Sequence, residues 1–172
     1  MIESSRAGGI FKATCVGPDG EVKWETEAHN LVVNQGLQDM NTKYFKGVSY
    51  TATWYIGLYG AAASNNPTAN DTAATHPGFT EVTPYSNATR PACTFGTATT
   101  ADPSVISNSA SVASFTINAT ATVGGAFLIS DNTKGGSAGV LFSASDFAAP
   151  GDRSLASGDT LLVTYTFSLD AA

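Results

Sequence analysis

The sequence predicts an all-β protein built as an antiparallel β-sandwich, with one short helix and an N-terminal hairpin. Short runs that alternate between apolar and polar residues recur along the chain, and Gly, Asn and Pro turns separate them. Only 13% of the 172 residues are charged, and Thr, Ser, Ala, Gly and Asn take their place. This composition suits strands and turns, whereas long surface helices would need more Glu, Lys and Arg. We expect a jelly-roll or immunoglobulin-like arrangement.

The N-terminal part of the chain predicts an arm followed by a hairpin. Residues 1–9 are polar and end in two glycines, so we expect them to form the arm. Residues 10–16 and 21–27 alternate as strands do, and they flank the turn sequence Gly-Pro-Asp-Gly at 17–20. Proline presets one turn dihedral and glycine accepts a positive φ, so this segment predicts a tight hairpin.

One helix is predicted after the hairpin. Apolar residues recur there at helical spacing at four positions: Val33, Leu37, Met40 and Tyr44. Asn34 is the expected N-cap, and Gly47 is the expected C-terminal stop. A single short helix beside many strands is expected to cover one open end or edge of a sheet.

The remainder of the chain predicts further strands. The expected ranges are 54–59, 80–85, 90–97, 112–123, 126–130, 139–143 and 160–169, with a long loop at 60–79. The last strand is the clearest. Its inward residues are expected to be Leu161, Val163, Tyr165, Phe167 and Leu169. We expect one sandwich domain over residues 10–172, composed of a hairpin and helix at 10–47 and a β region at 53–170.

The charge and the cysteines narrow the class of partner. A net charge of −6 with only eight Lys and Arg cannot neutralise many phosphates, so we expect no nucleic acid as partner. An anionic membrane surface is disfavoured for the same reason. Small neutral polar groups are easily desolvated, which suits packing against other subunits, although an ordinary acidic surface has the same composition. Cys15 and Cys93 lie in strand-like runs and are expected to be buried, unpaired core residues.

No secretory signal or membrane span is expected. The first six residues lack a basic segment followed by an apolar one, and no apolar run approaches the roughly 20 residues that a span requires. We therefore expect the protein to be made in a cytoplasm.

Candidate catalytic and metal-binding motifs are weak. Neither His29 nor His76 has a second ligand at metal-binding spacing. Residues 135–139 match Gly-x-Ser-x-Gly, but strand-like runs lie on both sides, so they predict a hairpin loop and not a nucleophile elbow. Asp131 opens a faint calcium-loop pattern whose later acidic ligands are missing, so a turn is expected. We expect no enzyme activity and no cofactor.

Aromatic residues could line a sugar-binding face, but their alternation with aliphatic residues favours core packing. The candidates are Trp54, Tyr55, Tyr59, Phe79 and Tyr85. Carboxylates at five further positions are expected to make turn hydrogen bonds: Glu81, Asp102, Asp146, Asp152 and Asp159.

Residues from about 53 to 170 resemble a family of small virion proteins of tailed bacteriophages. The matching pieces follow the family's order: 54–59, 80–82, 85–90, 92–96, 107–110, 126–131, 140–142, 153–155 and 157–161. The gap between Tyr85 and Arg90 is longer than in the family pattern. The segment at 29–34 before the helix is similar to one in virion proteins of short-tailed phages.

The resemblance implies a structural role in the virion. The expected role is a capsid decoration, or cement, protein on the outer head surface, which binds the major capsid protein or other virion proteins, forms a symmetric oligomer and is made in the host bacterial cytoplasm. The alternatives are a low-copy neck, tail or fibre-attachment protein, and an adhesin for host glycans. Chain ends and long loops can reach neighbours without disturbing a core, so the arm and residues 61–79 are expected to carry the contacts. Three apolar anchors are expected: Ile2, Ile10 and Phe79.

Overall fold

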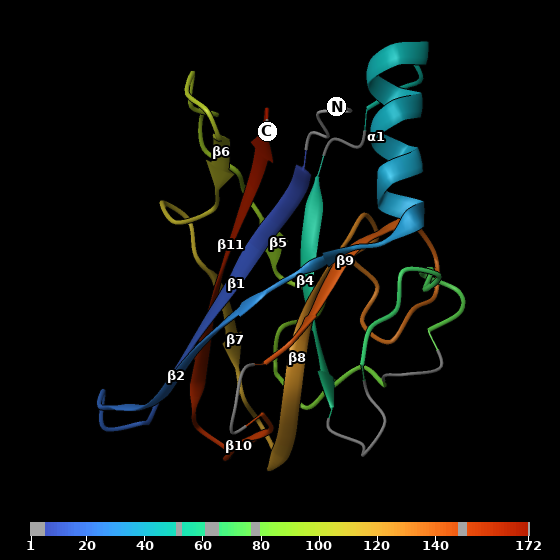
Figure 1. The fold of residues 1–172 in the computed structure, drawn as a ribbon. Coiled ribbons are helices and arrows are strands. Elements are labelled where there is room, and N and C mark those ends of the chain that lie inside the picture. Colours follow the sequence, from blue (N-terminus) through green and yellow to red (C-terminus); the bar gives the residue numbers. More distant parts are fainter. Residues whose placement is uncertain (1–5, 51–52, 61–65, 77–79, 148–150, 172) are drawn as a thin grey trace.

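The fold is a sandwich of two antiparallel sheets in a computed structural model that describes residues 6–50, 53–60, 66–76, 80–147 and 151–171. Figure 1 shows the sheets face to face, with the helix α1 (Asn34–Lys46) beside one end of the sandwich. The predicted all-β sandwich with a single short helix is therefore confirmed for the described residues.

The first sheet is centred on the last strand, β11 (Thr160–Asp170). One side of β11 pairs along its whole length with β1 (Arg6–Val16), which in turn pairs with β2 (Val22–His29). The other side of β11 pairs near its start with β7 (Ala113–Thr116) and near its end with β6 (Ser104–Ser107).

A buried asparagine, Asn108, fills the gap that β6 and β7 leave along β11. Its side-chain oxygen accepts a hydrogen bond from the Tyr165 amide at 2.7 Å, and its side-chain amide donates to the Val163 carbonyl at 3.3 Å. A side chain thus replaces the missing ladder bonds, as buried backbone groups require.

The predicted hairpin forms, but its first strand is longer than expected. The Gly17 amide donates to the Glu21 carbonyl at 2.9 Å, and Gly20 has a φ of 84°. β1 begins at Arg6, opposite Asp170 of β11. Residues 6–9, expected in an arm, therefore belong to the sheet, because β11 extends far enough to pair with them. Residues 1–5 lie outside the described residues.

The second sheet contains one long central strand, β8. Its elements are β3 (Leu31–Val32), β9 (Leu141–Asp146), β8 (Ala121–Ile129), β4 (Trp54–Gly60) and β5 (Ala92–Cys93), in that order, and β10 (Arg153–Leu155) pairs with the start of β8. β8 continues through Gly124 and Gly125, where the sequence predicted a break. A Cβ atom on Gly125 would lie only 2.1 Å from the ring of Tyr59 on the neighbouring strand, so the glycine leaves room for this ring.

Several other strand predictions were wrong in extent. The expected strand at 80–85 is reduced to isolated bridges at Glu81 and Tyr85, and the one at 90–97 to the two residues of β5. The expected strand at 112–123 is divided between β7 and β8, while β6 and β10 were not predicted. Short strands carry too few alternating residues to be recognised without their partners.

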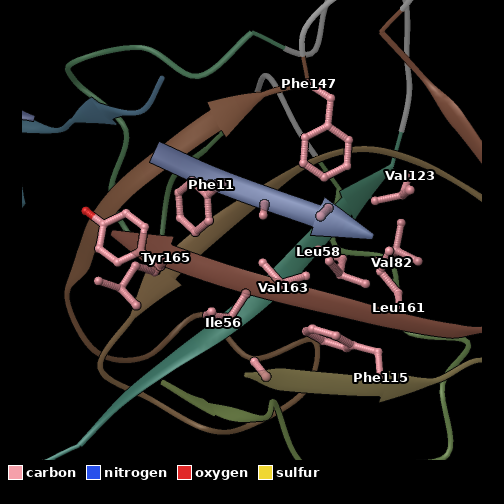
Figure 2. Packing of buried hydrophobic residues seen from close by; sticks show 14 of the residues in the cluster. Phe11, Ile56, Leu58, Val82, Phe115, Val123, Phe147, Leu161, Val163 and Tyr165 are labelled. Atoms are coloured by element: carbon pink, nitrogen blue, oxygen red, sulfur yellow. The ribbon is translucent and has the colours of Figure 1, made fainter. Parts of the chain in front are cut away.

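The main core lies between the two sheets. Figure 2 shows Phe11, Leu58, Phe115 and Val163 among the side chains that meet there from both layers. Cys15 and Cys93 are buried and unpaired, as predicted. A second apolar cluster is separate from the main core. It contains Val33, Tyr59, Ala73, Phe127, Ile129, Leu141 and Ala144.

The inward face of β11 follows the prediction over most of its length. Leu161, Val163 and Tyr165 are fully buried, but Phe167 is only half-buried and Leu169 is 42% exposed. The apolar face of this strand therefore continues beyond the closed part of the core, toward the end of the sandwich where α1 stands.

Candidate functional site: an apolar groove at one end of the sandwich

An apolar groove opens at the end of the sandwich where α1 stands. It has a volume of about 950 Å3 and lies among α1, the start of β4, and the ends of β11 and β6, at the upper end in Figure 1. We call it the end groove. Its lining residues are Asp39, Met40, Asn41, Lys43, Tyr44, Phe45, Tyr50, Trp54, Phe95, Ile106, Leu128, Phe142, Tyr165, Phe167 and Leu169.

The floor of the end groove is part of the main core. Leu128, Phe142 and Tyr165 are buried core residues, and Trp54 and Phe167 pack against them. The ring of Phe142 lies 5.4 Å from the ring of Trp54 and 5.4 Å from that of Phe167, in edge-to-face geometry. Such contacts favour a rigid floor, so the groove is a preformed feature of the sandwich.

The rim of the end groove carries three strongly exposed aromatic side chains. Tyr44 is 74% exposed, Phe45 78% and Tyr50 74%. The rings of Tyr44 and Phe45 meet edge to face with centroids 5.0 Å apart. Contiguous exposed aromatic surface of this kind is uncommon on a monomer and is typical of interaction sites.

The charges in the lining of the end groove neutralise one another. Lys43 Nζ lies 3.3 Å from Asp39 Oδ1, one helical turn away, and both side chains are largely buried. The remaining polar lining groups are the Asn41 amide, the Trp54 indole N–H and the two tyrosine hydroxyls of the rim. The Tyr165 hydroxyl already accepts hydrogen bonds from Asn30 and Ser143. The groove therefore offers apolar area and few polar groups.

The position of α1 is fixed at its N-terminal turn. Gln35 Oε1 accepts hydrogen bonds from the amides of Leu141, at 2.8 Å, and Ala73, at 3.1 Å. Gly36 lies directly against β9, where a Cβ atom would be 2.3 Å from the Phe142 carbonyl oxygen. The helix is thus held at one end, and its last turn projects beside the groove.

The helix departs from its prediction in two ways. Val33 is the cap residue and Asn34 begins the helix, with its side-chain amide donating to Asn70 Oδ1 at 3.0 Å. Gly47 ends the helix with a φ of 67°, as predicted. Of the predicted apolar stripe, Val33 is buried and Met40 is partly buried against the main core, but Leu37 and Tyr44 are exposed.

The opposite end of the sandwich is closed by a buried carboxylate, Asp159. Its Oδ2 accepts hydrogen bonds from Lys23 Nζ at 2.7 Å and from the Ala156 amide at 2.8 Å, and it lies 3.6 Å from Cys15 Sγ. Burial and the neighbouring carboxylate raise the pKa of Cys15 to about 11, so this thiol stays protonated and unreactive at neutral pH. The Asp159 site has the character of a structural clamp.

A second buried ion pair, Arg90 with Glu81, organises the loops over the second sheet. Arg90 is 2% exposed, and its Nε and Nη2 donate to the two carboxylate oxygens of Glu81 at 2.9 and 2.7 Å. The same guanidinium donates to the carbonyls of Asp131, at 2.9 Å, and Gly136, at 2.7 Å. The turn hydrogen bond expected for Glu81 is thus replaced by an ion pair, whereas Asp131 does form the expected turn, accepting from the Thr133 amide at 2.9 Å.

An open pocket beside this pair brings together Ser137, His76 and Glu81. Both Glu81 oxygens accept from Arg90, and Oε2 also accepts from the Gly135 amide at 2.7 Å, so the carboxylate serves to hold Arg90 and the 135–136 loop in place. Ser137 lies in the loop between the antiparallel strands β8 and β9, as predicted, and not at a strand-to-helix turn. These groups therefore do not form a nucleophile elbow.

The sequence-predicted site residues do not meet at the end groove. Ile2 and Phe79 lie outside the described residues. Ile10 is half-buried in β1, opposite His29 and Thr166, on the face of the sheet that points away from the main core. Of the aromatic candidates, Tyr59 and Tyr85 are fully buried, and Trp54 lies in the groove floor.

Sequence reasoning missed Phe45 and Tyr50 on the rim and Gly36 at the helix contact. A glycine inside a helical pattern costs about 1 kcal/mol relative to alanine and usually has a packing reason, so Gly36 could have been noticed.

Within the ranges that the structure describes, no three His, Cys, Asp or Glu side chains lie close enough together to hold a metal ion. The described part of the chain contains no helix long and apolar enough to cross a membrane. Comparison of the chain with protein-family models, with curated proteins and with solved structures found no match in any of the three.

Proposed function

We propose that this chain is a structural component of a tailed-bacteriophage virion, a decoration protein that binds the mature head shell and stabilises it. The observation that carries the proposal is the end groove, where the described residues leave an apolar, largely aromatic end of the core open beside three exposed aromatic side chains. Protein interfaces are enriched in such side chains and depleted of charge at their centre. The sequence resemblance supplies the virion context.

The stabilising mechanism is mass action. A protein that binds the assembled lattice and not its free subunits shifts the equilibrium toward the assembled state. Each of many identical copies contributes a modest binding free energy, and together they make the shell more resistant to rupture. The low charged fraction of the chain, 13%, supports this role, because a surface with few charges is desolvated at low cost when it packs against neighbours.

The groove chemistry favours a protein partner over a glycan. A sugar presents hydroxyl groups around its ring, and each one that is buried without a hydrogen-bond partner costs free energy. In the end groove, Asp39 and Lys43 pair with each other, which leaves the Asn41 amide, the Trp54 indole N–H and the Tyr44 and Tyr50 hydroxyls. The host-glycan adhesin remains a rival, and specific binding on a glycan array would favour it.

The test is the copy number of this chain in purified virions, measured by quantitative mass spectrometry against the major capsid protein. A number equal to that of the capsid subunits, or a simple fraction of it, supports decoration. A handful of copies per particle supports the neck, tail or fibre-attachment alternative instead. Absence from virions overturns the structural role. Rupture of heads at lower temperature when the chain is deleted, with restoration by the added protein, would tie the copies to shell stability.

A further inference from the structure

We propose that the end groove is an interface between two copies of this chain. The Tyr44 and Phe45 rings of each copy enter the groove of the other, so that the two α1 helices lie side by side about a two-fold axis. This inference rests on the proposed assembly function, whose immediate partner it names.

The end groove is a part of the core that the described residues leave uncovered. Its floor residues Leu128, Phe142 and Tyr165 belong to the main core cluster, yet one side of the groove opens to solvent. The last turn of α1 does not cover this side, because Gln35 and Gly36 fix the helix against β9 at its other end. A partner that enters the groove therefore extends an existing, rigid core and needs little rearrangement.

The end groove and its rim present enough apolar area for a dimer interface. Three aromatic side chains that are each about three-quarters exposed, together with the half-exposed Leu169, present on the order of 500 Å2 of apolar surface at the rim. The groove walls add to this. A standard protein interface buries roughly 800 Å2 on each partner, of which somewhat more than half is apolar. The end groove and its rim on one copy of the chain therefore carry about the apolar area that one side of a stable dimer requires.

The end groove and its rim, taken together as one patch, are complementary to themselves. A two-fold interface places the same surface on both subunits, so each must carry both the projection and the hollow. Here the projection is the edge-to-face pair Tyr44 and Phe45, and the hollow of about 950 Å3 lies directly beside it. A surface with only the projection or only the hollow would require a partner other than a second copy of this chain.

The distribution of charge also favours contact between two copies through this patch. The chain carries a net charge of −6, which disfavours contact between two copies over most of the surface. Within the groove lining, the charged groups Asp39 and Lys43 form an internal pair at 3.3 Å. Two copies can therefore approach through this patch with little like-charge repulsion.

The experiment is sedimentation equilibrium of the purified full chain over a range of concentrations. The highest concentration is about 1 mM, so that even a dimer with a dissociation constant near 1 mM would be detected. We expect a mass of twice the 17.6 kDa of one chain. The double variant Tyr44→Ser/Phe45→Ser should raise the dissociation constant about 100-fold or more, because exposed aromatics at the centre of an interface dominate binding. Val22→Ser is the matched control, since Val22 is 57% exposed on β2 and does not line the groove; it should leave the constant unchanged.

A distance measurement tests the geometry itself. Cys15 and Cys93 are buried, so a spin label attached to an Asn41→Cys variant reports that position alone. We expect one short distance between the labels of two copies. A label at Val112→Cys, outside the groove lining, should give a longer distance.

Each outcome decides the inference. A monomer at every concentration, with the native fold retained by circular dichroism, overturns it and leaves the groove to a different virion protein. A dimer that survives the double variant, or long Asn41→Cys distances, also overturns it. The copy number in virions is an independent result. A dimer that is absent from virions refutes the proposed function alone, and a virion protein that is monomeric in solution refutes this inference alone.

Discussion

Two apolar surfaces of this molecule lie beside its central core, and they differ in how far the described loops cover them. The outer face of the second sheet carries Tyr59, Phe127 and Ile129, each at most 3% exposed. Loops held by Arg90 cover this face, and the guanidinium carbon lies 5.4 Å from the centre of the Phe127 ring. At the end groove, the described residues place no such loops over Tyr44 and Phe45, which are mostly exposed.

The difference shows where the chain completes its own core and where it does not. Covering a surface with loops requires polar anchors that satisfy the backbone groups buried with them. Arg90 provides such an anchor over the second sheet, and Asp159 provides one at the end opposite the groove. In the end groove, the polar pair Asp39 and Lys43 joins two residues of one helix.

The largest expected effect is on the covered face. Arg90→Ala should lower the free energy of unfolding by about 3–5 kcal/mol, because it leaves Glu81 as a buried charge without its cation. Urea unfolding followed by circular dichroism measures the change. The double variant Arg90→Met/Glu81→Gln should recover part of the loss, since it removes both charges together. A loss below about 1 kcal/mol for Arg90→Ala would show that the loops are held by other contacts.

The clamp at the closed end should give a smaller effect that depends on pH. Burial by itself raises the pKa of Asp159, but hydrogen bonds from Lys23 and the Ala156 amide outweigh it and hold the pKa below its usual value of 3.8. The stabilisation from this carboxylate is therefore complete above pH 3.8 and is lost as the pH falls from there through the lowered folded value. Asp159→Asn should cost about 1–3 kcal/mol at pH 7, and its unfolding free energy should approach that of the wild type in acid.

Asp146 provides the control with the opposite sign. Burial raises its pKa, with Asp152 adding to the rise and the Tyr59 hydroxyl opposing it, so ionisation of Asp146 disfavours the folded state at neutral pH. The difference in stability between Asp146→Asn and the wild type should favour the variant at pH 7 and shrink on acidification. If the curves of both variants ran parallel to the wild type, the two carboxyls would have ordinary pKa values in the folded protein.

Local features of the fold could be predicted from the sequence, and the covered and uncovered surfaces could not. The turn at 17–20, the stop at Gly47 and the inward face of β11 up to Tyr165 each follow from residues that are close along the chain. The Arg90 anchor joins Glu81, Asp131 and Gly136, and no local spacing marks these as partners.

The end groove could not be predicted from the apolar pattern of α1 either. Apolar residues at helical spacing predict a buried stripe, and that spacing is present from Val33 to Tyr44. Whether the stripe is covered depends on where the helix stands, which the contacts of Gln35 and Gly36 with β9 decide. Periodicity identifies the face that avoids water but does not identify the surface that covers it.

Gly36 therefore offers a way to change the groove without touching its aromatic residues. In Gly36→Ala the new methyl group would lie 2.3 Å from the Phe142 carbonyl oxygen and 2.9 Å from its Cα, and backbone atoms cannot move aside as a side chain can. The helix must shift away from β9, at a cost of roughly 1–3 kcal/mol. Fluorescence of Trp54 in the groove floor, measured in a Trp24→Phe background, should change. Gln38→Ala, an exposed position on the same helix, should change neither quantity.

The smallest expected effect on stability is at the rim of the groove. Phe45→Ala should alter the unfolding free energy of the monomer by no more than about 0.5 kcal/mol, because its ring is 78% exposed and supports little of the fold. Phe127→Ala, the matched phenylalanine on the covered face, should cost about 3–5 kcal/mol. Unfolding of both variants is best measured at a chain concentration low enough to keep the protein monomeric. A large loss at Phe45 under these conditions would mean that the aromatic rim supports the fold itself, and the contrast between a covered and an uncovered surface would fail.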